Sequence, residues 1–160
     1  MKYSNYKFKF YLNASHSIYI NGVQGENHTH TWEIQLNTIK AVEDFIQFND
    51  IEKLIETFLS QYQDKYINDV EPFNSINPTL ENICEYFKDK VEKVLFDSGW
   101  VLVSIEISET PARSYIIDLV DEIDLSKFSN SRNVNDSNTI DALVNKKLAD
   151  IISKNSGKSE

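Results

Sequence analysis

The only three histidines of this 160-residue chain are spaced so that they could hold one metal ion. His28 and His30 lie two residues apart in an HTH segment, and on an extended strand this spacing turns both imidazoles to the same side. His16 precedes them across a polar loop, and antiparallel pairing of the flanking strands would bring it back beside them. We therefore predict a zinc site formed by His16, His28 and His30.

Three imidazole nitrogens on zinc leave a fourth tetrahedral position for water or substrate, which is typical of catalytic rather than structural sites. Neutral ligands also leave the double charge of the ion uncompensated. The ion can then polarise a bound carbonyl or hydroxyl, or lower the pKa of a bound water. On spacing alone, three exposed loop histidines explain the same residues equally well.

Stretches of alternating polarity flank the histidine loop and would position it. Residues 6–12 and 31–39 have the period-two pattern of half-buried strands. Their apolar positions are Tyr6, Phe8, Phe10, Trp32, Ile34 and Leu36. We expect two antiparallel strands joined by a long loop with histidines at both ends.

Two amphipathic helices are predicted in the middle of the chain. The first opens at Asn49, with Glu52 three residues on as in a capping box, and the second follows Thr79, which can cap it. Their apolar stripes are Ile51, Leu54, Ile55, Phe58 and Leu59, and Leu80, Ile83, Cys84, Phe87, Val91 and Val94. Thr79 and Glu81 are therefore interpreted as helix-start residues rather than ligand contacts.

Residues 100–108 and 114–120 predict two further strands, separated by Pro111, which cannot donate to a strand ladder. In the first of these strands, Val101, Val103, Ile105 and Ile107 are expected on one face. The order strand, strand, helix, helix, strand, strand indicates an α+β fold with both helices on one face of an antiparallel sheet. The other face would then need cover, which predicts a homo-oligomer.

The expected organisation is one domain at residues 1–120, a polar linker at 121–138, an amphipathic helix at 139–153 and a disordered tail at 154–160. Sixteen basic and 25 acidic residues give a formal charge of −9, which would repel nucleic acid and anionic membranes. The sequence shows neither a signal peptide nor a membrane span, and its single cysteine cannot form an intramolecular disulfide. A cytoplasmic protein is the expectation.

Several short motifs, taken in order, resemble the 6-pyruvoyl tetrahydropterin synthase and 6-carboxytetrahydropterin synthase family. The resemblance covers residues 8–115. The motifs are ASH at 14–16, HTH at 28–30, AVEDF at 41–45, YQDKYIN at 62–68, NPTLENI at 77–83 and ISETP at 107–111. It implies that ASH and HTH supply the three zinc ligands, with Thr29 in place of the middle glycine of the family.

The family has a tunnelling fold, in which subunits close oligomeric barrels and active sites lie between subunits. The resemblance therefore implies a hexameric zinc-dependent lyase that acts on 7,8-dihydroneopterin triphosphate or a related dihydropterin. Glu109 of ISETP would accept hydrogen bonds from the amino group and ring NH of the pterin. The alternative for Glu109 is a surface residue at the end of a strand.

The residues that the family uses for proton transfer are replaced in this chain. The catalytic cysteine corresponds to Gln24, and an aspartate–histidine pair corresponds to Gln63 and Asp64. A glutamine side chain has no proton to exchange near neutral pH. Cys84 lies on an apolar helix stripe, where a thiol acts as a small hydrophobe.

Glu26 is the best substitute base, because it lies two residues before His28 and some relatives use a glutamate in place of the cysteine. Its alternative is a solvated loop carboxylate. Asp64 is a second candidate if burial raises its pKa, although the neighbouring Lys65 favours the opposite shift. Two hypotheses follow: a zinc-dependent lyase, and a catalytically inactive zinc- and pterin-binding homologue.

Overall fold

A five-stranded sheet forms the framework of the computed structural model, which describes residues 5–41 and 46–123. The strand order is β5-β1-β4-β6-β7. Antiparallel pairing joins β1 (Tyr6–His16), β4 (His28–Lys40), β6 (Trp100–Thr110) and β7 (Arg113–Asp118). The sheet is nevertheless mixed rather than antiparallel throughout, because the two-residue β5 (Lys65–Tyr66) pairs with β1 in parallel.

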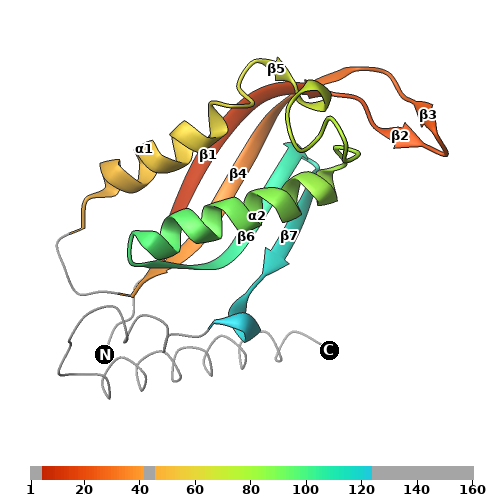
Figure 1. Ribbon diagram of the computed structural model, residues 1–160. Helices are drawn as coiled ribbons and strands as arrows, with labels where there is room; N and C mark the ends of the chain where they lie inside the picture. The colour runs from red at the N-terminus through yellow and green to blue at the C-terminus, as the bar shows by residue number, and fades with distance from the viewer. Residues whose placement is uncertain (1–4, 42–45, 124–160) are drawn as a thin grey trace, which may run out of the picture.

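Two helices, α1 (Phe48–Leu59) and α2 (Leu80–Asp97), cover one face of this sheet (Figure 1), which confirms the predicted α+β arrangement. The short strands β2 (Tyr19–Ile20) and β3 (Val23–Gln24) form a hairpin that projects beyond one end of the sheet. A 3-10 helix, η1 (Ile67–Asp69), follows β5. Within the described residues, no helix is long and apolar enough to cross a membrane.

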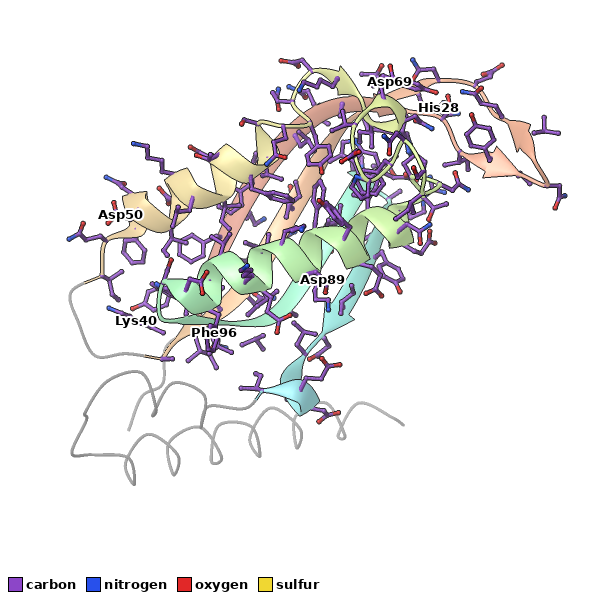
Figure 2. All side chains as sticks on the ribbon, viewed as in Figure 1. His28, Lys40, Asp50, Asp69, Asp89 and Phe96 are labelled. Carbon is purple, nitrogen blue, oxygen red and sulfur yellow. The ribbon has the colours of Figure 1, made fainter. Side chains whose placement is uncertain are left out.

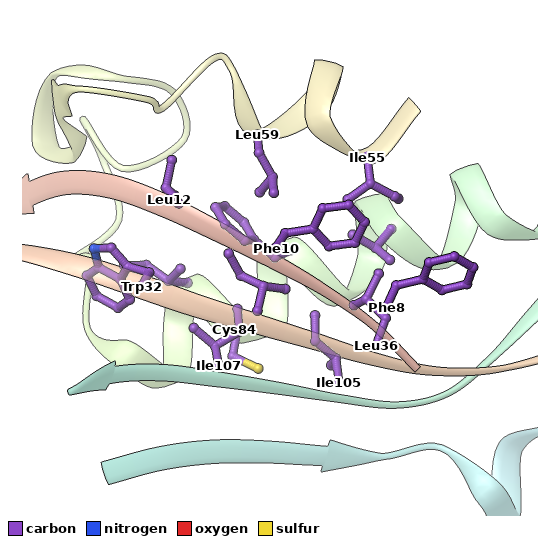
Figure 3. Close-up of a cluster of buried hydrophobic side chains, with 14 of the residues drawn as sticks. Phe8, Phe10, Leu12, Trp32, Leu36, Ile55, Leu59, Cys84, Ile105 and Ile107 are labelled. Atoms are coloured by element: carbon purple, nitrogen blue, oxygen red, sulfur yellow. The ribbon is translucent and has the colours of Figure 1, made fainter. Parts of the chain in front are cut away.

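The hydrophobic core lies between the helices and the sheet (Figure 3). The alternation in β1 and β4 turns one set of side chains to the core, as predicted: Phe8, Phe10, Trp32, Ile34 and Leu36 are buried and Tyr6 packs against them. The helices contribute Ile51, Ile55, Leu59, Ile83, Phe87 and Val91. Burial of these two apolar stripes holds both helices on the same face of the sheet.

The two helices begin differently. The hydroxyl of Thr79 accepts a hydrogen bond of 3.3 Å from the backbone N–H of Asn82, so the predicted cap of α2 is confirmed. The capping box predicted at Asn49 is wrong, because α1 begins at Phe48, with Gln47 in the cap position and no side-chain cap bond. The Phe48 ring packs 5.5 Å from that of Tyr6, so packing rather than capping accompanies this helix start.

The expectation that four alternating residues of β6 share one face is also wrong. Trp100 and Leu102 face the core together with Ile105 and Ile107, because a register shift against β4 leaves Val103 without a partner. A bulge of this kind inserts one extra residue and shifts the alternation by one. Val101 is therefore on the other side from Ile105, and only the second half of the strand follows the predicted pattern.

The sheet face opposite the helices is mostly polar. Asn37 Nδ2 of β4 donates a hydrogen bond to Ser104 Oγ of β6 (2.7 Å), and Gln35 Nε2 donates one along β4 to Glu33 Oε1 (2.6 Å). Tyr11 and Ile116 are exposed apolar exceptions. Since polar side chains tolerate water, the polarity of this face does not by itself require cover, and the homo-oligomer stays a prediction.

The chain leaves the sheet through a second 3-10 helix, η2 (Val120–Glu122), with Leu119 and Val120 buried. Asp121 and Glu122 of this helix, and Ile123 after it, fall within the predicted linker. The remainder of that linker, the predicted helix at 139–153 and the tail at 154–160 lie outside the described residues.

Candidate metal centre

The three histidines meet at the end of β1 and the beginning of β4. The register places His16 opposite His28 and Ala14 opposite His30, so all three imidazoles start from the same side of two adjacent strands. The ring centroids of His16 and His30 are 5.3 Å apart, and those of His28 and His30 are 6.2 Å apart. Figure 2 shows His28 at the end of the sheet from which the β2–β3 hairpin projects.

His16 is the most firmly held of the three. Its side chain is buried, and Nδ1 donates a hydrogen bond of 2.8 Å to the carbonyl oxygen of Pro78. Histidines that bind metals commonly donate their other ring N–H to such a carbonyl, which fixes the tautomer and the ring orientation. Burial lowers the pKa of His16 more than the hydrogen bond to Pro78 raises it, so the ring favours the neutral form that binds a metal.

Two asparagines hold the segment that follows His16. The Asn68 amide accepts a hydrogen bond from the N–H of Ser17 (2.9 Å) and donates one to its carbonyl (2.8 Å). The Asn77 amide makes the same pair of bonds, both 2.9 Å, with the backbone of Tyr19. Each amide thus bonds the backbone N–H and C=O of one residue, as the backbone of a neighbouring strand would. The sequence motifs contain both asparagines, one at the end of YQDKYIN and one at the start of NPTLENI. Nothing in those motifs indicates that their side chains bond the backbone after His16.

Glu109, at the end of β6, points its carboxylate at His16. Oε2 lies 3.9 Å from Nε2 of His16, and the guanidinium of Arg113, across the β6–β7 turn, pairs with Oε1. One ligand atom from each of His16, His30 and Glu109 falls within 4.8 Å of the others. His28 is exposed and does not belong to this group in the described part of the chain.

The group formed by His16, His30 and Glu109 fits a zinc ion. Imidazole nitrogens and a carboxylate oxygen are common zinc ligands, and the tautomer of His16 leaves Nε2 free to coordinate. The buried Trp32 ring packs edge-on against both His16 and His30, at centroid distances of 4.9 and 5.5 Å, which limits how far either imidazole can turn. The geometry can therefore hold a cation between β1, β4 and β6.

Neither of the tentative catalytic carboxylates contacts this centre. Glu26 is exposed in the loop after β3. Asp64 is also exposed, has a positive φ of 58°, and accepts a hydrogen bond of 3.1 Å from the neighbouring Gln63. Within the described residues, no hydrogen bond or ion pair joins either carboxylate to a histidine. A role in proton transfer stays a prediction for both.

Gln24, which the resemblance predicts at the position of the family's cysteine, contacts the ring hydroxyl of Tyr66. Its Nε2 donates a hydrogen bond of 2.8 Å to that oxygen, so the projecting hairpin is tied to β5. Tyr66, whose side chain carries a phenolic proton, is a residue of this site that the sequence did not single out.

Cys84 lies inside the core (Figure 3), where burial raises the pKa of its thiol to about 12. It cannot replace the missing thiolate.

The model of the 6-pyruvoyl tetrahydropterin synthase family matches residues 5–119 of the chain. A comparison with curated proteins gives no significant match. Among solved structures, 6-pyruvoyl tetrahydropterin synthase from Caenorhabditis elegans superposes with a TM-score of 0.63 and 18% identity, over 74% of this chain and 96% of that one.

The Plasmodium falciparum 6-pyruvoyl tetrahydropterin synthase gives a TM-score of 0.51 at 13% identity, over 71% of this chain and 97% of that one. A catalytic-residue mutant of the Plasmodium vivax enzyme gives 0.52 at 12% identity, over 73% and 98%. At such low identities these structures share the fold and carry no residue roles across to this chain.

Proposed function

Because the chain belongs to the 6-pyruvoyl tetrahydropterin synthase family, we propose that it is a zinc-dependent lyase acting on 7,8-dihydroneopterin triphosphate or a related dihydropterin. The observation that supports this most is the buried His16, which Pro78 orients toward His30 and Glu109. A fixed, neutral imidazole beside a second histidine is what a metal-dependent member of the family would need.

In this proposal His16, His28 and His30 hold the zinc ion. When bound, zinc supplies Lewis-acid polarisation of the substrate's side-chain hydroxyls. His28 lies on the exposed rim and would reach the ion by turning about its side-chain bonds. Glu109 would recognise the pterin by accepting hydrogen bonds from its amino group and ring NH.

Proton transfer would fall to Glu26, with Asp64 as the second candidate. Both carboxylates are exposed on loops at the border of the sheet, so a substrate would contact them at the protein surface. In a family whose active sites lie between subunits, these loops would meet the substrate in an assembled oligomer. A carboxylate base then needs to approach to hydrogen-bond distance of the proton it removes.

The alternative function is a catalytically inactive zinc- and pterin-binding homologue. One observation favours it: the glutamines that replace two family residues are already engaged. Gln24 donates to Tyr66, and the backbone N–H of Asn13 donates to Oε1 of Gln63 at 3.2 Å. These side chains stabilise the local structure and offer no exchangeable proton.

A homo-oligomer, with a hexamer implied by the family resemblance, is part of the proposal. Within the described residues, β1 pairs with β5 only at Ala14 and Ser15, and Gln63 and Asp64 bond the backbone of Asn13, so residues 6–12 present an open strand edge. At the other side of the sheet, β7 is also an edge strand. Open edges are ready for pairing with another chain, and two copies could continue the sheet through them.

The test is incubation of purified, zinc-loaded protein with 7,8-dihydroneopterin triphosphate. Release of triphosphate with a change of the pterin side chain supports the lyase. Tight pterin binding without turnover over hours supports the inactive homologue and rules out the lyase. If the protein neither binds nor converts the pterin, both functions are wrong.

A further inference from the structure

We propose that Glu109 is itself a metal ligand in the substrate-free protein, together with His16 and His30. The inference rests on the proposed metal centre but assigns Glu109 a role that the pterin-binding prediction does not contain. Its basis is the direction in which the three side chains present their free electron pairs.

The tautomer of His16 decides what Nε2 can do. The carbonyl oxygen of Pro78 can only accept a hydrogen bond, so Nδ1 carries the proton and Nε2 of the neutral ring presents a lone pair. An ionised carboxylate likewise has only lone pairs to offer. Nε2 and Oε2 of Glu109 therefore face each other as two acceptors, 3.9 Å apart, with side chains that are largely buried. A cation between them would satisfy both.

The distances also suit a cation. Two ligands about 2.1 Å from a tetrahedral zinc ion lie about 3.4 Å from each other. Oε2 and Nε2 are 3.9 Å apart, and all three ligand atoms lie within 4.8 Å of one another. Each ligand atom therefore needs to move by less than about 1 Å to reach the separation that zinc requires. His28, from the exposed rim, is the remaining ligand of the set.

Arg113 fixes which carboxylate oxygen is available. Its guanidinium pairs with Oε1 and leaves Oε2 directed at His16. The Arg113 side chain is 65% exposed, so this pair adds little to stability. Its effect is instead on orientation, since hydrogen-bonded partners of a ligating carboxylate hold it in place for the metal. Arg113 is thus a positioning residue.

This arrangement has a consequence for the pterin. A pterin bound to Glu109 in a bidentate manner would need both carboxylate oxygens, one of which pairs with Arg113 while the other coordinates the metal. Pterin binding and metal ligation by Glu109 are therefore in competition. Pterin binding would release the Glu109 carboxylate from the ion and free a coordination position next to the bound pterin.

The experiment measures zinc affinity by competition with a chromophoric chelator, in the absence of pterin, for the full-length wild type and three variants. Glu109→Gln is expected to bind zinc at least tenfold more weakly. Glu109→Asp keeps the charge but shortens the side chain, and it should also lose affinity. Glu106→Gln, on the same strand but on the opposite face of the sheet, is the matched control and should bind like wild type. Equal affinities for Glu109→Asp, Glu106→Gln and wild type would overturn the proposal.

A crystal structure of the zinc-loaded protein separates ligation from a mere effect of charge. The expected position of the ion is within about 2.2 Å of Oε2 of Glu109. An ion more than about 3 Å away, with a water in between, would overturn the inference while leaving the metal centre intact. If His16→Ala also retains zinc, the proposed metal centre itself fails, which is a distinguishable result.

Discussion

His16 donates from Nδ1 to the carbonyl oxygen of Pro78, a residue 62 positions later in the chain, at 2.8 Å. This contact links the end of β1 to the residue before the cap of α2, so that the orientation of the imidazole depends on where the helix begins. Thr79 fixes that start and Asn77 clamps the backbone of Tyr19, which makes the NPT segment a support for the candidate metal centre.

The clamp at Asn68 is predicted to matter for zinc affinity as well as for folding. Asn68→Ala leaves both backbone groups of Ser17 without their partners, which should lower the free energy of unfolding by about 1–3 kcal/mol. It should also weaken zinc binding roughly 10-fold by loosening His16. Asn74→Ala is the control, because Asn74 is exposed and accepts only from the adjacent Ser75. Urea unfolding and chelator competition measure the two effects, and equal behaviour of the two variants would contradict the clamp.

The stability of the metal-free protein should fall as the solution becomes acidic. Burial lowers the pKa of His16 below its ordinary value of 6.5, so the unfolded chain takes up a proton at a higher pH than the folded one. This contribution to stability is complete above about pH 6.5 and is lost as the pH falls toward the pKa of the folded state.

Urea unfolding of the chelator-treated protein at about pH 7.5 and about pH 5.5 checks this sign. His16→Asn should show a smaller loss of unfolding free energy between the two pH values than wild type. The same loss in both proteins would mean that His16 is not the titrating group.

Cys84 is predicted to be unreactive in the native protein. Burial raises its thiol pKa to about 12, and the nucleophilic thiolate is therefore nearly absent at neutral pH. A thiol reagent such as Ellman's reagent should label the chain only after denaturation. Cys84→Ala should cost about 1–2 kcal/mol of stability through a small cavity and leave any lyase turnover intact. Rapid labelling of folded protein, or loss of turnover in a folded variant, would refute this assignment.

Glu26→Gln tests the candidate base. A general base contributes on the order of 10²–10⁴ in rate, so triphosphate release should fall at least about 100-fold while zinc affinity stays at the wild-type value. Glu56→Gln, an exposed glutamate on α1, should retain full activity. If Glu26→Gln keeps the activity of wild type, the base is another group.

Much of the fold could be predicted from local pattern, because alternation and helical stripes report which side chains are buried. The faces of β1, β4 and α2 follow this rule, and so does α1 except at Leu54, which was predicted on the apolar stripe and is exposed. The bulge at Val103 and the parallel strand β5 do not, since both depend on which strand lies alongside rather than on local polarity.

The candidate site shows the same division. The convergence of His16 and His30 follows from strand pairing, which the sequence pattern indicates. The bond to Pro78, the clamps at Asn68 and Asn77, and the pair between Glu109 and Arg113 depend on contacts between distant elements. A turn-flanking arginine has no sequence pattern that distinguishes it from an exposed surface charge.

The most direct test of the metal centre is elemental analysis of purified wild type and His16→Ala after incubation with zinc and removal of the excess. Both proteins are first shown to be folded by circular dichroism, and His28→Ala is measured beside them. We predict about one zinc ion per wild-type chain and a loss of stoichiometric zinc in both histidine variants. Stoichiometric zinc in the folded His16→Ala variant, or its absence from wild type, would contradict the central claim.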